Sequence, residues 1–440
     1  MFAATWVIAA VMCLTRQSLN LAGHNKLQHL RKKNLMLDLR LLLQFLVAES
    51  PRLRQSSVFR LLCFFAIFVF VGLLNVVQSQ IVFFEPNVGS VRAVANNGNL
   101  ALIDSVADEA LRYTDSGGIE RLGFLNDTIS DPESRADHIS DDGTAIAGSS
   151  DVRDNIQSGP SDDSDAFIWT QESGLLSVGT LDGFVGSTST GISGDGTVVI
   201  GQAFTIDNRQ SEGFRWTADT GAVSLGPEIG IPRDLSSDGR VIIGGPAIWK
   251  EGEGTTLLPV VSDSDSAVAR AVSGDGSIVV GAITSPVENS GLTEYRPVYW
   301  RNGDDPNEFV TPDGFSVGDR ISATDTTADG LLTIGLWETN DSVEALIWVN
   351  GGSPISIQSL LESQGNDLSE FGDDFLIVDD ISSSGDFITG RVFDRNTFFT
   401  VGSFRASLNV SAVPEPSSLV ILGIGTMAFA CRRRRLPVRT

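Results

Sequence analysis

The stretch "STGISGDGTVVIG", Ser189–Gly201, holds the local pattern that decides the fold. A short strand leads into Ser-Gly-Asp-Gly, and an apolar strand then runs to a closing glycine. Asp-Gly between two apolar runs is the strongest short signal for a β-hairpin. The dipeptide predicts a type I′ turn, in which both central residues have positive φ.

Six further copies of this pattern lie along the chain. They read "VRAVANNGNLALI", "ADHISDDGTAIAG", "PRDLSSDGRVIIG", "ARAVSGDGSIVVG", "ATDTTADGLLTIG" and "VDDISSSGDFITG". The turn glycines of the seven copies are Gly98, Gly143, Gly196, Gly239, Gly276, Gly330 and Gly385. Their mean spacing is about 48 residues, which is typical of propeller blades.

A second hairpin follows the first in each repeat. It carries an aromatic residue with a small or apolar residue two positions earlier, and these aromatics are Tyr113, Trp169, Trp216, Trp249, Trp300 and Trp348. A further strand follows in most copies, as in "LLSVGTLDG". Four strands in each of seven repeats predict an all-β fold, a β-propeller of seven four-stranded blades. A right-handed β-solenoid is the alternative.

The last repeat lacks its fourth strand, which predicts how the ring closes. Aligning Ser403–Ala406 with Gly213–Trp216 puts Ala406 at the aromatic position, and the chain then runs into its C-terminal tail. A surplus strand, "IVFFEP", precedes the first repeat. We expect Ile81–Phe84 to complete the last blade beside residues 401–410, which leaves no open edge. Deleting it should cost more stability than deleting four residues from 285–291.

The N-terminal region divides into a leader and an export signal. Residues 58–79 contain an apolar run of signal-peptide length, and a signal peptidase is expected to cut between Ser79 and Gln80. A retained membrane anchor is the alternative. Residues 1–57 are long for a leader, and Met12 and Met36 are alternative starts, which favours an over-called start codon. The propeller is then expected over residues 80–411.

The composition of residues 80–411 excludes several classes of protein. This segment holds 52 Asp and Glu against 17 Lys and Arg, a net charge of −35, which argues against nucleic-acid binding. All three cysteines lie outside it, so it forms no disulfide and no cysteine metal site. Its single histidine is His138 and its single lysine is Lys250.

The second and third repeats resemble a known family. "DAFIWTQESGLLSVGTLDG" followed by "GISGDGTVVIG" is similar to the HAF repeat of bacterial extracellular proteins, named for a His-Ala-Phe triplet. Here Asp165, Glu212 and Glu344 stand in place of the histidine. The resemblance implies a repeat fold outside the cell, and it brings no catalytic residues.

The C-terminal tail, residues 412–440, combines three unlike features in order. Pro414, Glu415 and Pro416 form a stiff motif, residues 417–431 are apolar, and Arg432, Arg433, Arg434 and Arg435 follow. As a helix the apolar segment is about 22 Å long, short against a hydrocarbon core of about 30 Å. The arginines would hold its far end on the cytoplasmic side. A plain membrane anchor is the alternative.

This arrangement resembles the PEP-CTERM sorting signal. The resemblance implies a transient membrane anchor that the protease exosortase recognises and removes. The body is then released to the cell surface or the exopolysaccharide matrix, in a Gram-negative-type bacterium that makes such a matrix.

The chain offers little that indicates catalysis. Acidic residues such as Asp162, Asp163 and Asp165, or Asp373 and Asp374, could form a glycosidase pair, but loop acids are the simpler interpretation. His138 has no partner Ser or Cys motif. The sequence therefore predicts no catalytic residue and no cofactor.

Calcium is the better ligand hypothesis. The loops "SDDSDAF" and "SDSDSA" offer several oxygen ligands, although neither has EF-hand spacing. Loose binding of counter-ions is the alternative.

These observations together predict an exported, non-enzymatic repeat protein that binds polysaccharide or a surface protein. A carbohydrate-active enzyme on the same scaffold and a structural adhesin are the alternatives.

Overall fold

The computed structural model describes residues 81–409 except 86–88, 154–163, 206–209, 288–289, 340, 369–370, 372–373, 396 and 398. The leader, the signal peptide and the sorting tail lie outside the described residues. Ser79 and Gln80, the residues that flank the expected signal peptidase cut, also lie outside them, so this cut stays a prediction.

No helix among the described residues is both long and apolar enough to span a membrane. The expected span at 417–431 lies outside them.

The strands form seven antiparallel sheets of four strands each. Blade 1 contains β2 (Ser90–Val94), β3 (Leu100–Asp104), β4 (Glu109–Thr114) and β5 (Gly118–Gly123). Blade 2 contains β6 (Ser134–Ile139), β7 (Ala145–Asp151), β8 (Ser164–Thr170) and β9 (Gly174–Gly179). Blade 3 contains β10 (Gly186–Ile192), β11 (Val198–Phe204), β12 (Ser211–Thr217) and β13 (Gly221–Ser224). Blade 4 contains β14 (Asp234–Leu235), β15 (Val241–Gly244), β16 (Ala247–Lys250) and β17 (Gly254–Leu257).

The remaining blades follow the same order of strands. Blade 5 contains β18 (Ser266–Val272), β19 (Ile278–Pro286), β20 (Thr293–Arg301) and β21 (Asn307–Glu308). Blade 6 contains β22 (Arg320–Thr326), β23 (Leu332–Glu338), β24 (Val343–Val349) and β25 (Ile355–Ser356). Blade 7 contains β26 (Phe375–Ile381), β27 (Phe387–Phe393), β28 (Thr400–Ser407) and, from the other end of the chain, β1 (Ile81–Phe84).

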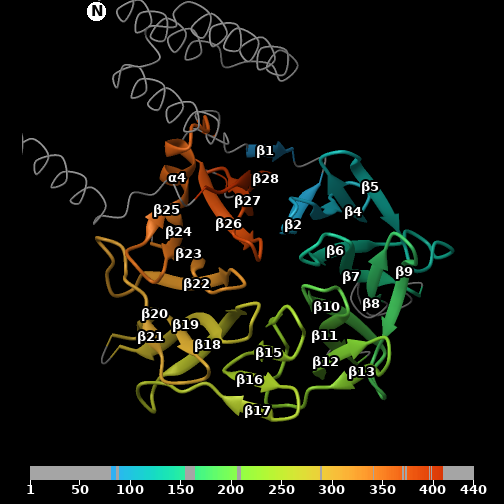
Figure 1. Ribbon diagram of the computed structural model, residues 1–440, viewed down its shortest axis with the longest axis horizontal. Helices are drawn as coiled ribbons and strands as arrows, with labels where there is room; N and C mark the ends of the chain where they lie inside the picture. The colour runs from blue at the N-terminus through green and yellow to red at the C-terminus, as the bar shows by residue number, and fades with distance from the viewer. Residues whose placement is uncertain are drawn as a thin grey trace, which may run out of the picture. The chain divides into compact units, whose positions relative to one another are not determined.

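The seven sheets stand in a ring, which confirms the propeller and rules out the solenoid (Figure 1). The first strand of each repeat lies innermost, and neighbouring first strands contact each other all the way round the ring. Seven segments far apart in the sequence therefore meet at the central channel.

The closing strand lies where the sequence predicts it. Strand β1 pairs antiparallel with β28, with Ile81 opposite Ala406 and Phe84 opposite Ser403. Because β1 occupies the outer position of blade 7, the last sheet also has four strands. The first and last segments of the described chain are thus hydrogen-bonded to each other.

The Asp-Gly turns differ from the predicted type I′ geometry. All seven turn glycines have positive φ, between 65° and 79°, but the residues before them are not among those with positive φ. In blade 2 the Gly143 N–H bonds the carbonyl of Ser140, so glycine is the fourth residue of the turn. This is the longer hairpin loop, in which one left-handed residue follows an ordinary turn. The type I′ expectation is therefore wrong.

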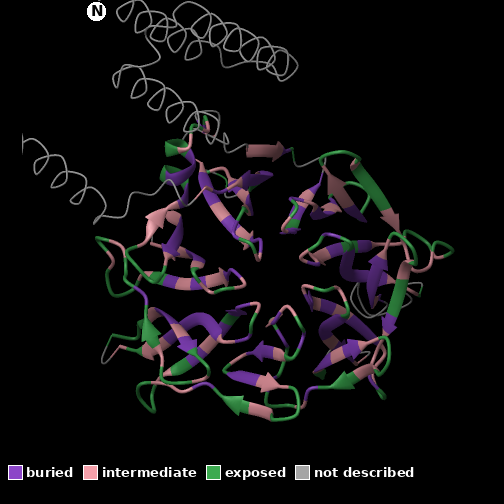
Figure 2. Cartoon of the chain, viewed as in Figure 1, coloured by how far each residue is buried: buried purple, intermediate pink, exposed green. Residues whose placement is uncertain are grey.

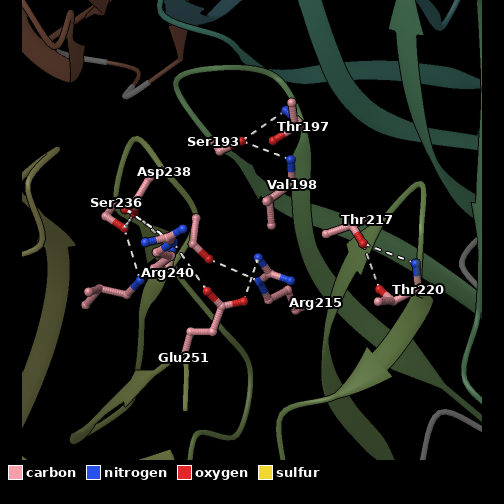
Figure 3. A network of polar contacts seen from close by, with 12 residues as sticks. Ser193, Thr197, Val198, Arg215, Thr217, Thr220, Ser236, Asp238, Arg240 and Glu251 are labelled. Carbon is pink, nitrogen blue, oxygen red and sulfur yellow. Dashed lines mark hydrogen bonds and ion pairs between the residues drawn. The ribbon is translucent and has the colours of Figure 1, made fainter. Parts of the chain in front are cut away.

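A serine or threonine three positions before the glycine fixes six of the seven turns, and the first repeat has Ala95 in its place. In blade 3 the Ser193 Oγ accepts the Val198 N–H at 2.9 Å (Figure 3). The same hydroxyl donates to Asp195 at 2.6 Å. The same arrangement recurs in blade 4, where Ser236 contacts Asp238. Equivalent bonds from the next strand go to Ser140, Ser273, Thr327 and Ser382. Ser and Asp in this motif are thus accounted for by turn structure.

The hydrophobic core lies between the blades rather than inside one layer. Each of seven buried clusters joins one blade to the next, such as Ile146 of blade 2 with Ala101 of blade 1. Figure 2 shows buried residues concentrated in the inner strands and exposed ones at the perimeter. Each sheet therefore buries both faces, as its apolar strands require.

One short helix was not predicted from the sequence. Helix α4 (Ile357–Ser363) follows β25, and the side chain of Ser356 caps its N-terminus. It buries Ile357, Leu360 and Leu361 in the cluster between blades 6 and 7. The spacing of these three residues, i, i+3 and i+4, is typical of one face of a helix. The signal is short, and the surrounding sequence has the periodicity of strands.

Candidate functional site

The central channel brings together one equivalent residue from each blade. This residue stands five positions before the turn glycine, and the set is Ala93, His138, Gly191, Asp234, Ala271, Asp325 and Asp380. Each lies opposite the corresponding residue of the second strand, as Asp325 lies opposite Ile334. In β2, β6, β10, β18, β22 and β26 the register shifts by one residue immediately before this position. Such a bulge redirects the side chain and is frequent beside functional sites.

Three of these residues are aspartates that join neighbouring blades. Asp234 Oδ2 accepts the N–H of Val272 in blade 5 at 2.7 Å. Asp325 Oδ2 accepts the N–H of Ile381 in blade 7 at 2.9 Å. Asp380 Oδ2 accepts the N–H of Val94 in blade 1 at 2.7 Å, which links the last blade to the first. We call these three residues the channel aspartates.

The channel aspartates hold their protons more tightly than ordinary carboxyls. Removal from bulk water raises the pKa of Asp234 to about 8, and the nearby charges of Asp325 and Asp141 act in the same direction. Burial raises the pKa of Asp380 well above its usual value, and Asp325 beside it adds to the effect. Burial also raises the pKa of Asp325. Two neighbouring carboxyls in a dry site favour sharing one proton over ionising together.

His138 occupies the same ring in blade 2. Burial lowers its pKa, the charge of Arg92 adds to this shift, and the charge of Asp137 opposes it. The imidazole is therefore neutral at pH 7 and can both donate and accept a hydrogen bond. It lines the same cavity as the channel aspartates.

The cavity is closed at the end where the turns meet. It has a volume of about 120 Å³, enough for several water molecules. Its floor is a circle of hydrogen bonds between the seven turns. The bonds run Asn96 N to Asp141 O, Asp141 N to Gly194 O, Asp195 N to Ser237 O, Ser237 N to Gly274 O, Asp275 N to Ala328 O, Ala328 N to Ser383 O, and Ser384 N to Asn96 Oδ1.

The Asp141 carboxylate crosses this floor. It accepts the hydroxyls of Ser383 at 2.5 Å and Ser237 at 3.2 Å, from blades 7 and 4. A Cβ at Gly194 would collide with the same carboxylate. The floor therefore requires a glycine here.

Charged residues stand one position before five of the channel residues, on the side away from the turns, and we call this end of the channel the mouth; they are Arg92, Asp137, Arg233, Arg270 and Asp379. Arg92 pairs with Asp137 at 3.4 Å, and Arg391 forms two bonds of 2.7 and 2.6 Å to Asp379. Arg233 also lines the cavity there and is exposed. The mouth is thus more basic than the acidic chain as a whole.

Of the acidic residues proposed from the sequence, the structure describes Asp165 and Asp374, and each has a contact of its own. Asp165 accepts the Ser177 hydroxyl at 2.9 Å, and Asp374 accepts the Arg395 N–H at 3.3 Å. Asp162, Asp163 and Asp373 lie outside the described residues. The structure therefore assigns no shared role to Asp165 and Asp374.

One aspartate of the second calcium loop is held by protein contacts. Asp265 accepts Arg296 at 2.9 Å and Ser285 at 2.7 Å, so its carboxylate is not free to coordinate a cation. Across the part of the chain that the structure describes, no group of three or more His, Cys, Asp or Glu residues is placed to hold a metal ion. The first loop lies partly outside that part.

Sequence reasoning missed the channel aspartates, although a signal for them is present. In "PRDLSSDG", "ATDTTADG" and "VDDISSSG" an aspartate stands five positions before the turn glycine. Aligning the repeats on that glycine would have shown that all three share one place in the ring. Read singly, each is only a polar residue in an inner strand.

One family comparison gives a match. Residues 412–435 match the PEP-CTERM protein-sorting motif, which implies export and surface sorting through exosortase. The resemblance of the repeats to HAF stays a prediction. Comparison with curated proteins gives no match.

Several solved structures resemble this fold at low sequence identity. A prolyl endopeptidase is 14% identical over 76% of this chain and 50% of its own, with a TM-score of 0.47. Oligogalacturonate lyase from Vibrio parahaemolyticus is 12% identical over 76% and 92%, with a TM-score of 0.45. TolB from Acinetobacter baumannii is 15% identical over 62% and 61%, with a TM-score of 0.34. The chain thus spans about half of the length of the endopeptidase and about three fifths of the length of TolB.

Proposed function

We propose that this protein is a non-enzymatic propeller, sorted by exosortase to the cell surface or exopolysaccharide matrix, where it binds polysaccharide. The sorting motif at 412–435 is the observation that carries the proposal, because it implies delivery to that location. A transient membrane anchor at 417–431 and a signal peptidase cut between Ser79 and Gln80 belong to the same proposal.

The hydrogen bonds of the buried carboxyls support a binding role. In the channel, each of the three aspartates accepts a backbone N–H from the next blade; they are Asp234, Asp325 and Asp380. Such bonds hold neighbouring blades together and give these carboxyls a structural use. A rigid ring with a pocket closed at one end suits recognition of a ligand in a fixed conformation.

A carbohydrate-active hydrolase is the competing function, and one observation favours it. Asp325 and Asp380 are adjacent carboxyls with raised pKa values, as in acid–base pairs of hydrolytic enzymes. If the protein is a hydrolase, Asp325→Asn should abolish its hydrolysis of polysaccharide.

A glycan array with the processed protein, recovered from outside the producing cells, tests both functions. We expect binding to one class of polysaccharide and no change in the length of the bound glycan, as measured by mass spectrometry. Shortened products would contradict the non-enzymatic role. Binding to no glycan, together with capture of a surface protein, would contradict the polysaccharide ligand.

A further inference from the structure

Two neighbouring arginines at the mouth of the cavity lack the carboxylate partner that many arginines of this chain have. Ion pairs with Asp or Glu hold Arg92, Arg112, Arg121, Arg215, Arg240, Arg296, Arg391 and Arg405. Within the described residues, Arg233 and Arg270 form no ion pair. In a chain of 55 acidic and 31 basic residues, carboxylate partners are abundant, so two adjacent arginines without one leave a local excess of positive charge.

The two side chains repel each other. Arg233 directly precedes β14 and Arg270 lies in β18, and these inner strands of adjacent blades contact each other. Burial lowers the pKa of Arg270, and the charge of Arg233 lowers it further, while Glu338 and Tyr295 oppose the shift. Two like charges held together cost free energy that a bound anion would recover.

The cavity below the arginines presents hydrogen-bonding groups but no cation. Arg233 lines it together with Thr190, His138 and the channel aspartates. The Thr190 hydroxyl is buried and has no hydrogen-bond partner. A ligand that enters from the mouth thus meets guanidinium groups first and polar groups able to bond hydroxyls below.

We propose that Arg233 and Arg270 bind the carboxylate of a uronic acid residue at the end of a polysaccharide that carries few other charges, with the sugar hydroxyls directed into the cavity. This inference rests on the proposed polysaccharide-binding function and names its ligand. Guanidinium matches carboxylate through two parallel hydrogen bonds, which gives both strength and orientation.

The overall charge of the protein favours a ligand with few charges. A net charge of −35 over residues 80–411 repels a dense polyanion such as nucleic acid. At physiological salt the Debye length is about 8 Å, so the distant acids are largely screened from a single carboxylate at the mouth. A chain end that bears one carboxylate among hydroxyls avoids the repulsion felt by a polyanion, and its single charge is screened from the distant acidic residues.

Calorimetric titration of the processed protein tests the proposal. The probe is an oligosaccharide ending in glucuronic acid, and its matched control is the same molecule with the carboxyl reduced to a neutral hexose. One variant combines Arg233→Gln with Arg270→Gln, and a second replaces both arginines by lysine. The control variant is Arg240→Gln, which removes an exposed charge at a turn of blade 4. Matching melting temperatures show that the exposed substitutions leave the fold intact.

The acidic probe should bind at least about tenfold more tightly than the neutral one, and the double glutamine variant should lose this preference. The lysine variant should show a preference for the acidic probe between those of the unsubstituted protein and the double glutamine variant. Lysine keeps the positive charge but lacks the planar guanidinium that forms two parallel hydrogen bonds. An unchanged preference in the double glutamine variant, or an equal loss in Arg240→Gln, would overturn the proposal. So would displacement of the sugar by inorganic sulfate at equal concentration.

Failure of this site and failure of the proposed function are separable. If the protein binds both probes equally, the polysaccharide-binding function stands and the arginine site is wrong. If it binds neither probe and no glycan on the array, both are wrong.

Discussion

At the scale of single residues, the channel aspartates show how one side chain can serve the fold and set its pH dependence. Each bridges two blades through a backbone N–H, and each does so in a site where ionisation is disfavoured. The folded ring therefore keeps protons that the unfolded chain releases. Stability must fall as these protons are lost.

We predict that Asp234→Asn flattens the dependence of unfolding free energy on pH between 6.5 and 8. The pKa of Asp234 rises from 3.8 to about 8 on folding, so the folded state binds the extra proton and loses stability as pH rises through this range. One proton contributes at most about 1.4 kcal/mol per pH unit. Below pH 6.5 His138, with its lowered pKa, opposes this trend. Urea denaturation at fixed pH values gives the slope.

The control for this prediction is Asp263→Asn, in an exposed loop between β17 and β18. It should leave the slope unchanged. Asparagine at 234 cannot accept both the Leu235 and Val272 N–H groups, so a constant loss of about 1 kcal/mol at every pH is also expected. A slope in Asp234→Asn equal to that of the unsubstituted protein would show that Asp234 is ionised in the fold.

At the scale of elements, three arginines hold neighbouring blades together. Arg112, Arg215 and Arg405 occupy one place in the third strand of blades 1, 3 and 7. Each donates to the carbonyl of the next turn glycine, as Arg215 Nε does to Gly239 at 3.0 Å (Figure 3). Each guanidinium also lies over an aromatic ring of the next blade. The corresponding residues of blades 2, 4 and 6 are Ile168, Ile248 and Ile347.

We predict that Arg405→Met lowers the unfolding free energy by about 2–3 kcal/mol, because Gly98 O loses its donor and the ring contacts are lost. Arg405 is only 5% exposed, and it lies over both Tyr113 and Phe387. Its Nη1 is 2.6 Å from Gly98 O. Arg240→Met, at an exposed ion pair, should change stability by less than about 0.5 kcal/mol. Equal effects in the two variants would contradict the interpretation.

The elements were predictable to the extent that their signals are local. Asp195-Gly196 and its equivalents identify the hairpins, since a turn needs only neighbouring residues. The channel ring was not predictable in the same way. Asp234, Asp325 and Asp380 become neighbours only after seven blades close, and the bulges before Asp325 and Asp380 leave no composition signal. The paired state of Asp265 likewise depends on Arg296, 31 residues away.

At the scale of the whole molecule, the ring is stable only if it closes. The seven hydrophobic clusters each join two blades, so an open ring would expose two sheet faces. Phe84 of β1 belongs to the cluster between blades 7 and 1. Asp380 and Arg405 reach across the same boundary to Val94 and Gly98. The joint between the chain ends thus carries strand pairing, apolar packing and polar bonds together.

We predict that deleting Ile81–Phe84 destabilises the protein far more than deleting Thr311–Gly314. The first deletion removes the strand paired with β28, the buried ring of Phe84, which is 5% exposed, and the Phe83 packing on Phe371 at 5.2 Å. Residues 311–314 lie between β21 and β22, mostly exposed. They replace 285–291 as the control, because Ser285 and Pro286 belong to β19.

The two deletions are compared by thermal unfolding followed by circular dichroism. The β1 deletion should lower the melting temperature by more than about 10 °C, since losses of several kcal/mol shift a domain of this size by about 2–4 °C per kcal/mol. A synthetic peptide of residues 80–85 should recover part of the loss, because the vacated edge of β28 keeps its unpaired N–H and C=O groups. Equal melting temperatures for the two deletions would mean that the clusters between the blades hold the ring closed without its last strand.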